Sequence, residues 1–163
     1  MSQRIEYFKV APEGMKVMMQ MEEYLHAGTL ESSLLELVKM RASQINGCAF
    51  CLDMHSKDAR VAGETEQRLY CLAAWRETAF YNERERAALE LTEHLTLVAE
   101  KRVPDELYER ARKQFSEKEL VDLTLAIVAI NGFNRLNVAF EPEVGGYYPG
   151  MFSAAKTTAS SGS

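Results

Sequence analysis

Four side chains in one short stretch of this sequence could do chemistry together. Cys48 and Cys51 form a C-x-x-C pair, and His55 follows at the fourth position after Cys51. Glu36 lies twelve residues before Cys48. The thiolate is the reactive form of cysteine, and a helix N-terminus or a neighbouring histidine favours it. A carboxylate can orient the imidazole, so the four residues could provide an activated thiol with a second thiol beside it to close a disulfide.

Helix geometry predicts which of the four lie together. On one helix, Cys48, Cys51 and His55 fall within roughly 60° of one another and therefore share a face. The Asn-Gly dipeptide before Cys48 is a strong helix breaker because both residues tolerate a positive φ. If the flanking helices fold back antiparallel, Glu36 lies within about one turn of His55 but roughly 9 Å along the axis from Cys51. The predicted order is carboxylate, imidazole, thiol.

Three alternatives compete with redox chemistry for the two cysteines. Cysteine, histidine and glutamate are all zinc ligands, but one short helix crowds three of them onto one arc, whereas structural zinc pairs usually sit on turns. A thioredoxin fold is disfavoured because no βαβ pattern surrounds the C-x-x-C pair. The two cysteines could also be buried packing residues. The pattern favours redox chemistry over all three, and we expect neither a metal nor a cofactor.

Composition restricts the classes of function. The 163 residues suffice for one domain with a real core, and 47% hydrophobic with 26% charged residues is ordinary for a globular protein. The net charge of −5 argues against nucleic acid or an anionic membrane as partner. The sequence has no long apolar run and no apolar secretory signal, so we expect no membrane span and a cytoplasmic location. Three cysteines do not make a disulfide framework, which fits a reducing compartment.

Apolar residues recur at helical spacing along the chain, which predicts a single all-α domain over residues 1–163. Residues 1–11 are expected to form an N-terminal arm, and about 142–163 an irregular tail. Start and stop residues predict seven helices. They lie between Pro12 and Gly28, over about 32–45, from near Cys48 to Gly63, after a cap at Thr65, over about 82–102, from Pro104, and over 120–140 after a capping box at Ser116.

Several other residues admit more than one interpretation. In the apolar helix over 120–140, the late polar residues either line a cleft or a neighbouring subunit, or simply face water; they are Asn131, Asn134, Arg135 and Asn137. The methionines of the helix after Pro12 fit flexible packing better than a binding stripe. We expect Cys71 in the core, His26 and His94 as surface or hydrogen-bonded histidines, and Trp75 and Tyr81 as packing or interface residues.

The spacing of the four residues resembles a known signature. Glu36, Cys48, Cys51 and His55 match the E-x₁₁-C-x₂-C-x₃-H pattern of AhpD-type alkylhydroperoxidases, within the wider carboxymuconolactone decarboxylase-like family, and the similarity runs from about residue 20 to 140. The resemblance implies an all-helical fold that forms homotrimers or homohexamers. It also implies reduction of hydroperoxides by thiols without haem, flavin or metal, with a thiol, dithiol or lipoyl-type electron donor. Cys48 and Cys51 are then the redox pair, and His55 with Glu36 is the proton relay that activates Cys51.

One position departs from that signature. The best-studied peroxidases carry a second histidine immediately before the second cysteine, where this chain has Phe50. The site then keeps one imidazole, and we expect a preference for more apolar substrates. Members of the decarboxylase branch generally lack the C-x-x-C pair, which places this chain with the peroxidases. The alternatives are a redox-sensing or disulfide-exchange module and a lyase-type enzyme of the decarboxylase kind.

Overall fold

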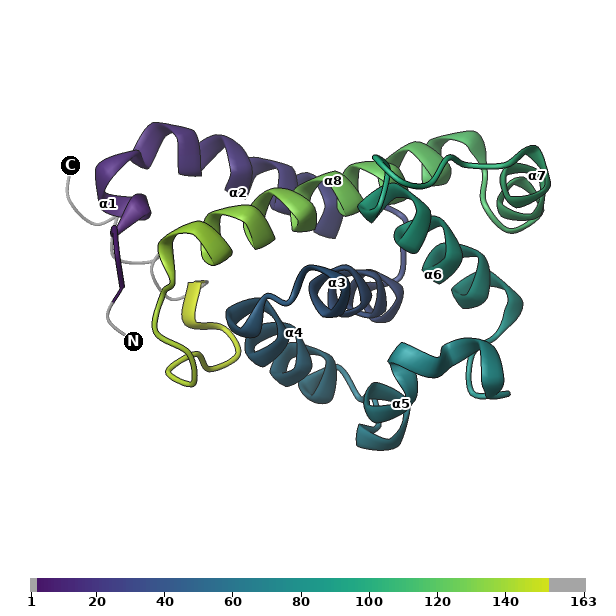
Figure 1. Cartoon of the computed structure of the whole chain (residues 1–163), viewed down its shortest axis with the longest axis horizontal. Coiled ribbons are helices and arrows are strands. Elements are labelled where there is room, and N and C mark those ends of the chain that lie inside the picture. Colours follow the sequence, from purple (N-terminus) through teal and green to yellow (C-terminus); the bar gives the residue numbers. More distant parts are fainter. Residues whose placement is uncertain (1–2, 153–163) are drawn as a thin grey trace.

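Helix α3 lies at the centre of the fold, with α4, α6, α8 and η1 packed against it (Figure 1). The computed structural model describes residues 3–152, and within them the chain forms helices and no strand, as predicted. The elements are α1 (Tyr7–Val10), α2 (Pro12–His26), α3 (Ser32–Asn46), α4 (Ala49–Val61), α5 (Glu66–Cys71), the 3₁₀ helix η1 (Leu72–Glu77), α6 (Glu83–Thr96), α7 (Asp105–Gln114) and α8 (Glu117–Phe140).

The longest helix, α8, is a core helix. It packs against α2, α3, α4, α6 and α7 along its length (Figure 1). An 18-residue window of α8 has a mean hydropathy of 1.3, so by length and composition alone the helix could cross a membrane. Core helices of soluble proteins pass the same test. Leu123 and Ile127 of α8 are buried in one cluster with Leu35 of α3, and this packing accounts for the apolar stretch.

A left-handed turn connects α3 to α4. Gly47 has φ 65° and ψ 32°, a conformation that favours glycine, and the Cys48 N–H then donates to the Ser43 carbonyl at 3.0 Å. A Cβ on Gly47 would meet no atom within 4 Å, so the position needs glycine for its backbone rather than for space. The turn folds α4 back onto α3 and makes Cys48 the N-cap residue of α4.

Side-chain caps fix the starts of the other helices as the sequence predicts. Asn82 with Glu85 forms a capping box at α6, and Ser116 with Glu119 forms another at α8. The Thr65 hydroxyl accepts from the Arg68 N–H at the start of α5. The breaks between helices can therefore be read from local sequence, because each cap satisfies backbone groups that the helix itself leaves open.

Three segments differ from the prediction. The expected N-terminal arm contains the short helix α1, because Tyr7 is buried and its ring packs 5.7 Å from Phe140. The helix capped by Thr65 changes to 3₁₀ geometry after Cys71, where Ala74 has non-helical angles, and Cys71 is half-buried rather than in the core. The helix expected over 82–102 ends at Thr96, because two following N–H groups turn back to the Leu97 carbonyl.

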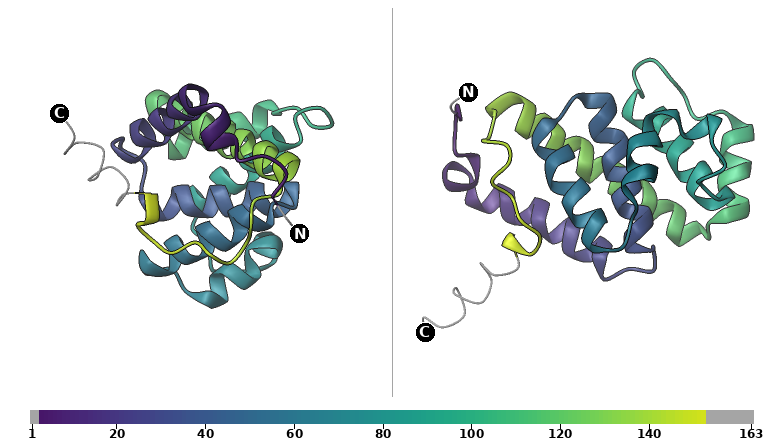
Figure 2. Two further views of the ribbon diagram at one scale, coloured as in Figure 1. Left: turned by 90° about the vertical axis from the view of Figure 1, so that its left-hand side faces the viewer. Right: turned by 90° about the horizontal axis from the view of Figure 1, so that it is seen from below.

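The two ends of the described chain meet beside the start of α4. Figure 2 shows the N-terminal segment and the irregular tail after α8 at the same end of the molecule. The Arg4 N–H donates to the Phe140 carbonyl at 2.9 Å, and Lys57 of α4 donates to the Tyr147 carbonyl at 2.9 Å. The chain is irregular over 142–150, within the tail predicted over about 142–163, and the part beyond residue 152 lies outside the described residues.

Replacing Gly47 by alanine should destabilise the fold. Alanine in the left-handed region costs about 1–2 kcal/mol, so Gly47→Ala should lower the free energy of unfolding by that amount in a urea titration. The matched control is Gly14→Ala in α2, where the backbone is helical and a Cβ meets nothing within 4 Å. That control should raise stability by about 0.5–1 kcal/mol. Equal effects in the two variants would contradict this account of the turn.

Candidate functional site

The two cysteines lie together at the N-terminus of α4. Cys48 is its N-cap residue and Cys51 lies in its first turn, with exposed fractions of 2% and 0%. Both are free thiols, and their Sγ atoms lie 2.7 Å apart and share a hydrogen bond. The Cys51 N–H also donates to the Cys48 sulfur at 3.4 Å. The fold therefore holds a buried dithiol that needs little movement to close a disulfide.

The contacts of the two sulfurs separate their acidities. The hydrogen bond with Cys51 lowers the pKa of Cys48 to about 7, against burial, which acts in the opposite direction. The same hydrogen bond and burial raise the pKa of Cys51 far above its usual range. The pair thus releases its first proton near neutral pH, and the charge rests on Cys48. The sequence-based expectation concerned activation of Cys51, so in the resting dithiol the thiolate lies on the other sulfur.

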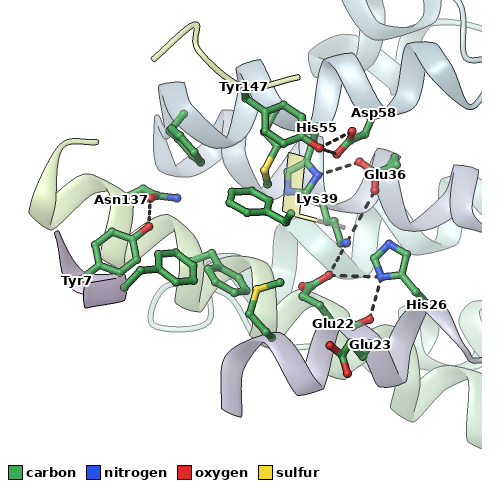
Figure 3. A pocket seen from close by; sticks show the side chains of 16 residues that line it. Tyr7, Glu22, Glu23, His26, Glu36, Lys39, His55, Asp58, Asn137 and Tyr147 are labelled. Atoms are coloured by element: carbon green, nitrogen blue, oxygen red, sulfur yellow. Dashed lines mark hydrogen bonds and ion pairs between the residues drawn. The ribbon is translucent and has the colours of Figure 1, made fainter. Parts of the chain in front are cut away.

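A chain of hydrogen bonds reaches Cys51 from the N-terminal segment. The Asn137 Nδ2 group of α8 donates to the Cys51 sulfur at 3.1 Å. The Tyr7 hydroxyl of α1 donates to Asn137 Oδ1 at 2.6 Å, which fixes the orientation of the amide (Figure 3). Burial and the nearby thiols raise the pKa of Tyr7 to about 12, so the phenol stays a donor. Tyr7 was missed from the sequence because its segment carried no helical signal.

The open question about the late polar residues of α8 is settled for its asparagines. Asn131, Asn134 and Asn137 are all buried, whereas Arg135 is exposed. Asn46, at the end of α3, donates to Asn131 Oδ1 at 3.0 Å and to Asn134 Oδ1 at 2.9 Å. The asparagines therefore tie α8 to the end of α3 just before the dithiol, and facing water describes Arg135 alone.

The predicted proximity of Glu36 and His55 is confirmed. His55 Nδ1 lies 2.8 Å from Glu36 Oε2, and the two side chains are 6% and 7% exposed (Figure 3). Burial raises the pKa of Glu36, but the hydrogen bond to His55 and the charges of His55 and Lys39 outweigh it and bring the pKa below its usual value. Glu36 is therefore a carboxylate that orients the imidazole and stabilises its charged form.

Three further side chains extend this pair, and the sequence analysis missed all of them. The Lys39 ammonium is 2% exposed and lies 2.6 Å from Glu22 and 3.8 Å from Glu36. The Tyr147 hydroxyl donates to the two oxygens of Asp58 at 2.7 and 2.9 Å (Figure 3). Burial raises the pKa of Asp58. Lys39 and Asp58 lie three residues from Glu36 and His55, so helical spacing could have found them; Tyr147 comes from the tail and gave no signal.

Two cavities flank the dithiol. One has a volume of about 410 Å³ and is lined by Glu36 and His55, by Phe50 and Asn137, and by side chains of α1, α2 and the tail (Figure 3). The other, of about 580 Å³, is lined by Cys48 together with Phe50 and Asn137. Phe50 and Asn137 thus form a wall between them. Neither cysteine lines the first cavity, although Asn137 contacts the Cys51 sulfur directly.

The structure does not bring together the cysteines, the histidine and the glutamate that a zinc site would need. Among residues 3–152, one group of metal-ligating side chains lies within 4.8 Å, namely Glu36, His55 and Asp58. Neither cysteine belongs to it, so the mixed cysteine, histidine and glutamate site is not assembled. Glu36 hydrogen bonds to His55 and forms an ion pair with Lys39 at 3.8 Å, while Asp58 accepts from the Tyr147 hydroxyl.

The chain is similar to proteins of one family. The model of the carboxymuconolactone decarboxylase family matches residues 12–94. Uncharacterized protein YdfG of Bacillus subtilis (strain 168) is 57% identical over 139 residues, which cover 85% of this chain and 95% of that protein.

Solved structures extend the similarity to the fold. A protein of unknown function from Agrobacterium tumefaciens, described as a candidate antioxidant defence protein AhpD, is 42% identical with a TM-score of 0.86, covering 90% of this chain and 100% of that one. An uncharacterized peroxidase-related protein from Ralstonia eutropha JMP134, an alkylhydroperoxidase AhpD core, has a TM-score of 0.75 at 17% identity, covering 85% and 74% of the two chains. At that identity the second likeness concerns the fold alone.

Removing Cys51 should make Cys48 a weaker acid. Cys51→Ala deletes the sulfur that hydrogen bonds to Cys48, so the pKa of Cys48 should rise from about 7 towards its ordinary value of about 8.5. The measurement is thiolate absorbance in the ultraviolet as a function of pH. Cys71→Ala is the matched control, since Cys71 lies on α5 and not in the dithiol. This variant should still show the thiol that titrates near pH 7. A wild type without any thiol titrating below about 8 would contradict the assignment.

Proposed function

Because the chain is an AhpD-like member of the carboxymuconolactone decarboxylase family, we propose that it reduces hydroperoxides with the Cys48–Cys51 dithiol. Membership of this family supports a general antioxidant or peroxidase-related role. One observation carries the finer proposal: a buried reduced dithiol, with sulfurs 2.7 Å apart, starts the same helix that presents His55 to Glu36. The second thiol can take the proton of the nucleophile, and the imidazole held by the carboxylate can give a proton to the leaving group.

The proposed reaction starts with a proton shift inside the dithiol. The Cys51 thiol gives its proton to the Cys48 thiolate across their hydrogen bond, and the Asn137 amide stabilises the thiolate formed on Cys51. That thiolate attacks the terminal oxygen of the hydroperoxide. The S–O bond forms as the O–O bond breaks, and the charged imidazole of His55 gives a proton to the departing alkoxide. The products are an alcohol and a sulfenic acid on Cys51.

The second thiol completes the oxidation. The Cys48 thiol attacks the Cys51 sulfenic acid, the S–S bond forms, and water leaves with the thiol proton. Cys48 also lines the second cavity, where an external thiol can reach the disulfide. Two thiol groups of the donor then restore the dithiol and become a disulfide themselves, so electrons balance over the cycle. The donor is a thiol, a dithiol or a lipoyl-type group.

The roles of the two cysteines follow from their neighbours. Cys51 precedes His55 by one helical turn and contacts Asn137. His55 and Asn137 both line the first cavity. Cys48 contacts the second cavity. We therefore assign attack on the oxidant to Cys51 and exchange with the reductant to Cys48. Phe50 and Asn137 line both cavities and Asn137 contacts the Cys51 sulfur, so we propose that the hydroperoxide reaches this sulfur from the first cavity past these two side chains.

The setting of the reaction is part of the proposal. Thiols supply both electrons, so the cycle uses no haem, flavin or metal. A dithiol that must be reduced again fits a reducing, cytoplasmic compartment. We propose a homotrimer or homohexamer as the assembly and small molecules or donor thiols as partners, with no role for nucleic acid or membranes.

A second candidate function rests on a specific observation. The first cavity is lined by Glu36 and His55, while neither cysteine lines it. A buried carboxylate and imidazole could perform proton transfer on a bound substrate without thiols, as a lyase-type enzyme needs. One variant distinguishes the two candidate functions. With serine at both cysteine positions, the protein should keep a lyase activity but lose a dithiol peroxidase activity.

Each cysteine should be essential for turnover. Cys48→Ser and Cys51→Ser should both abolish steady-state consumption of cumene hydroperoxide with dihydrolipoamide as donor. In the Cys48→Ser variant, dimedone should trap a sulfenic acid on Cys51, read by mass spectrometry. Cys71→Ser is the control and should turn over normally. A trapped adduct found solely on Cys48, in the Cys51→Ser variant, would reverse the assignment. One round of oxidation without turnover in the wild type would favour the redox-sensing module.

The Glu36 charge should matter for the rate. Glu36→Gln keeps an acceptor for His55 but removes the negative charge that stabilises the charged imidazole, so kcat/KM for the hydroperoxide should fall by at least about tenfold. Glu13→Gln is the matched control, because Glu13 is exposed in the first turn of α2 and lines no part of the cavity. An unchanged rate in Glu36→Gln would remove the relay from the mechanism.

A further inference from the structure

The cavity beside His55 has two chemically different ends. The ring of Tyr7 lies at one end, and the rings of Phe8, Phe50 and Phe133 also line the cavity (Figure 3). The other end carries the charged groups around Lys39 (Figure 3). The volume of about 410 Å³ lies in the range of cavities that enclose a small organic ligand. The hydroperoxide group must face His55, since that is where the proton is given, so the remainder of the molecule lies against the rings.

Carboxyl groups outnumber the cationic side chains at the polar end. Four carboxyl groups line it, from Glu22, Glu23, Glu36 and Asp58, against the ammonium group of Lys39 and the imidazoles of His26 and His55. Lys39 is already held by two of those carboxylates, at 2.6 and 3.8 Å. An additional carboxylate brought by a ligand finds like charges and an ammonium that is already paired. Glu36 is buried whereas Glu23 is exposed, so water screens the charge of Glu36 least and this carboxylate repels a ligand carboxylate most strongly.

The same contacts argue against a cationic ligand. Glu22 pairs with Lys39, Glu36 with His55, and the Asp58 oxygens accept from Tyr147. A ligand cation would lose its hydration without gaining an unpaired carboxylate. His55 uses Nδ1 for Glu36, which leaves Nε2 for one hydrogen bond to a ligand. A neutral ligand with one polar group fits this arrangement.

We infer that the cavity selects neutral hydroperoxides with an aromatic or similarly bulky apolar group and excludes those that carry a carboxylate. That the ligand is a hydroperoxide rests on the proposed function. The selection by charge and shape rests on the cavity alone. Fatty-acid hydroperoxides, with their carboxylate, are then poor substrates. Neutral aromatic hydroperoxides are good ones.

The test compares two ligands that differ by one carboxylate. Cumyl alcohol is the product of cumene hydroperoxide, and its para-carboxylate has the same ring and the same hydroxyl. Calorimetric titration of the reduced wild type should show the neutral alcohol binding at least about tenfold more tightly than the carboxylate. The same order should hold for kcat/KM of the two hydroperoxides. Phe133→Leu should weaken binding of the neutral alcohol, which places the ligand against the rings.

A charge variant tests the cause of the selection. Glu22→Gln keeps a hydrogen-bond acceptor for Lys39 but frees the positive charge, so the para-carboxylate should gain affinity and the preference should narrow several-fold. Glu13→Gln removes the same charge from the same helix outside the cavity and should leave the preference unchanged. A para-carboxylate that binds the wild type as tightly as the neutral alcohol overturns the inference, whatever the variants do.

The outcomes separate this inference from the proposed function. Selective binding of the neutral alcohol by a protein that does not turn over hydroperoxides leaves the cavity assignment standing and removes the peroxidase. Turnover of both hydroperoxides with equal kcat/KM would support the peroxidase activity and overturn the selection by charge.

Discussion

The left-handed turn at Gly47 is the constraint on which the site depends. It ends α3, reverses the chain, and leaves Cys48 as the N-cap of α4. From that single reversal follow the hydrogen bond from the Cys51 N–H to the Cys48 sulfur and the meeting of Glu36 with His55. A helix N-terminus favours negative charge, so the turn also supplies part of the environment in which a thiolate is stable.

The second determinant is a buried network of charge. Glu36, Lys39 and His55 are each less than a tenth exposed, and taking such groups out of water is costly unless they are paired. In residues 3–152 every buried side-chain nitrogen and oxygen has a hydrogen-bond partner. A purely structural core at this position could be built from leucines at lower cost. A fully paired polar network is consistent with a site that must move protons and keep its geometry while doing so.

Much of this arrangement can be predicted from sequence, and the remainder cannot for physical reasons. Local signals identify the capping residues Asn82 and Ser116, and helical periodicity places Glu36 opposite His55. Tyr7 and Tyr147 reach the site from the two ends of the chain, where no periodicity exists and tertiary packing alone decides.

Local signals fail in a second way inside otherwise regular segments. The end of α6 at Thr96 and the change to 3₁₀ geometry after Cys71 were missed because the following backbone turns, rather than a marked breaker residue, end those helices. The polarity of the two thiols was missed as well. The difference between the pKa values of the two thiols depends on the hydrogen bonds and burial of each sulfur, which tertiary packing decides.

The hydrogen bonds from Tyr7 to Asn137 and from Asn137 to Cys51 connect the N-terminal segment to the sulfur that takes part in the proposed redox cycle. Two processes that share a contact are linked, and the free energy of linkage is the same in both directions. If docking of α1 stabilises the reduced dithiol, then oxidation loosens α1 by an equal amount. Under the proposed function, the position of the first helix would then depend on the oxidation state of a sulfur that it does not contact, and holding or displacing that helix would shift the midpoint potential of the pair.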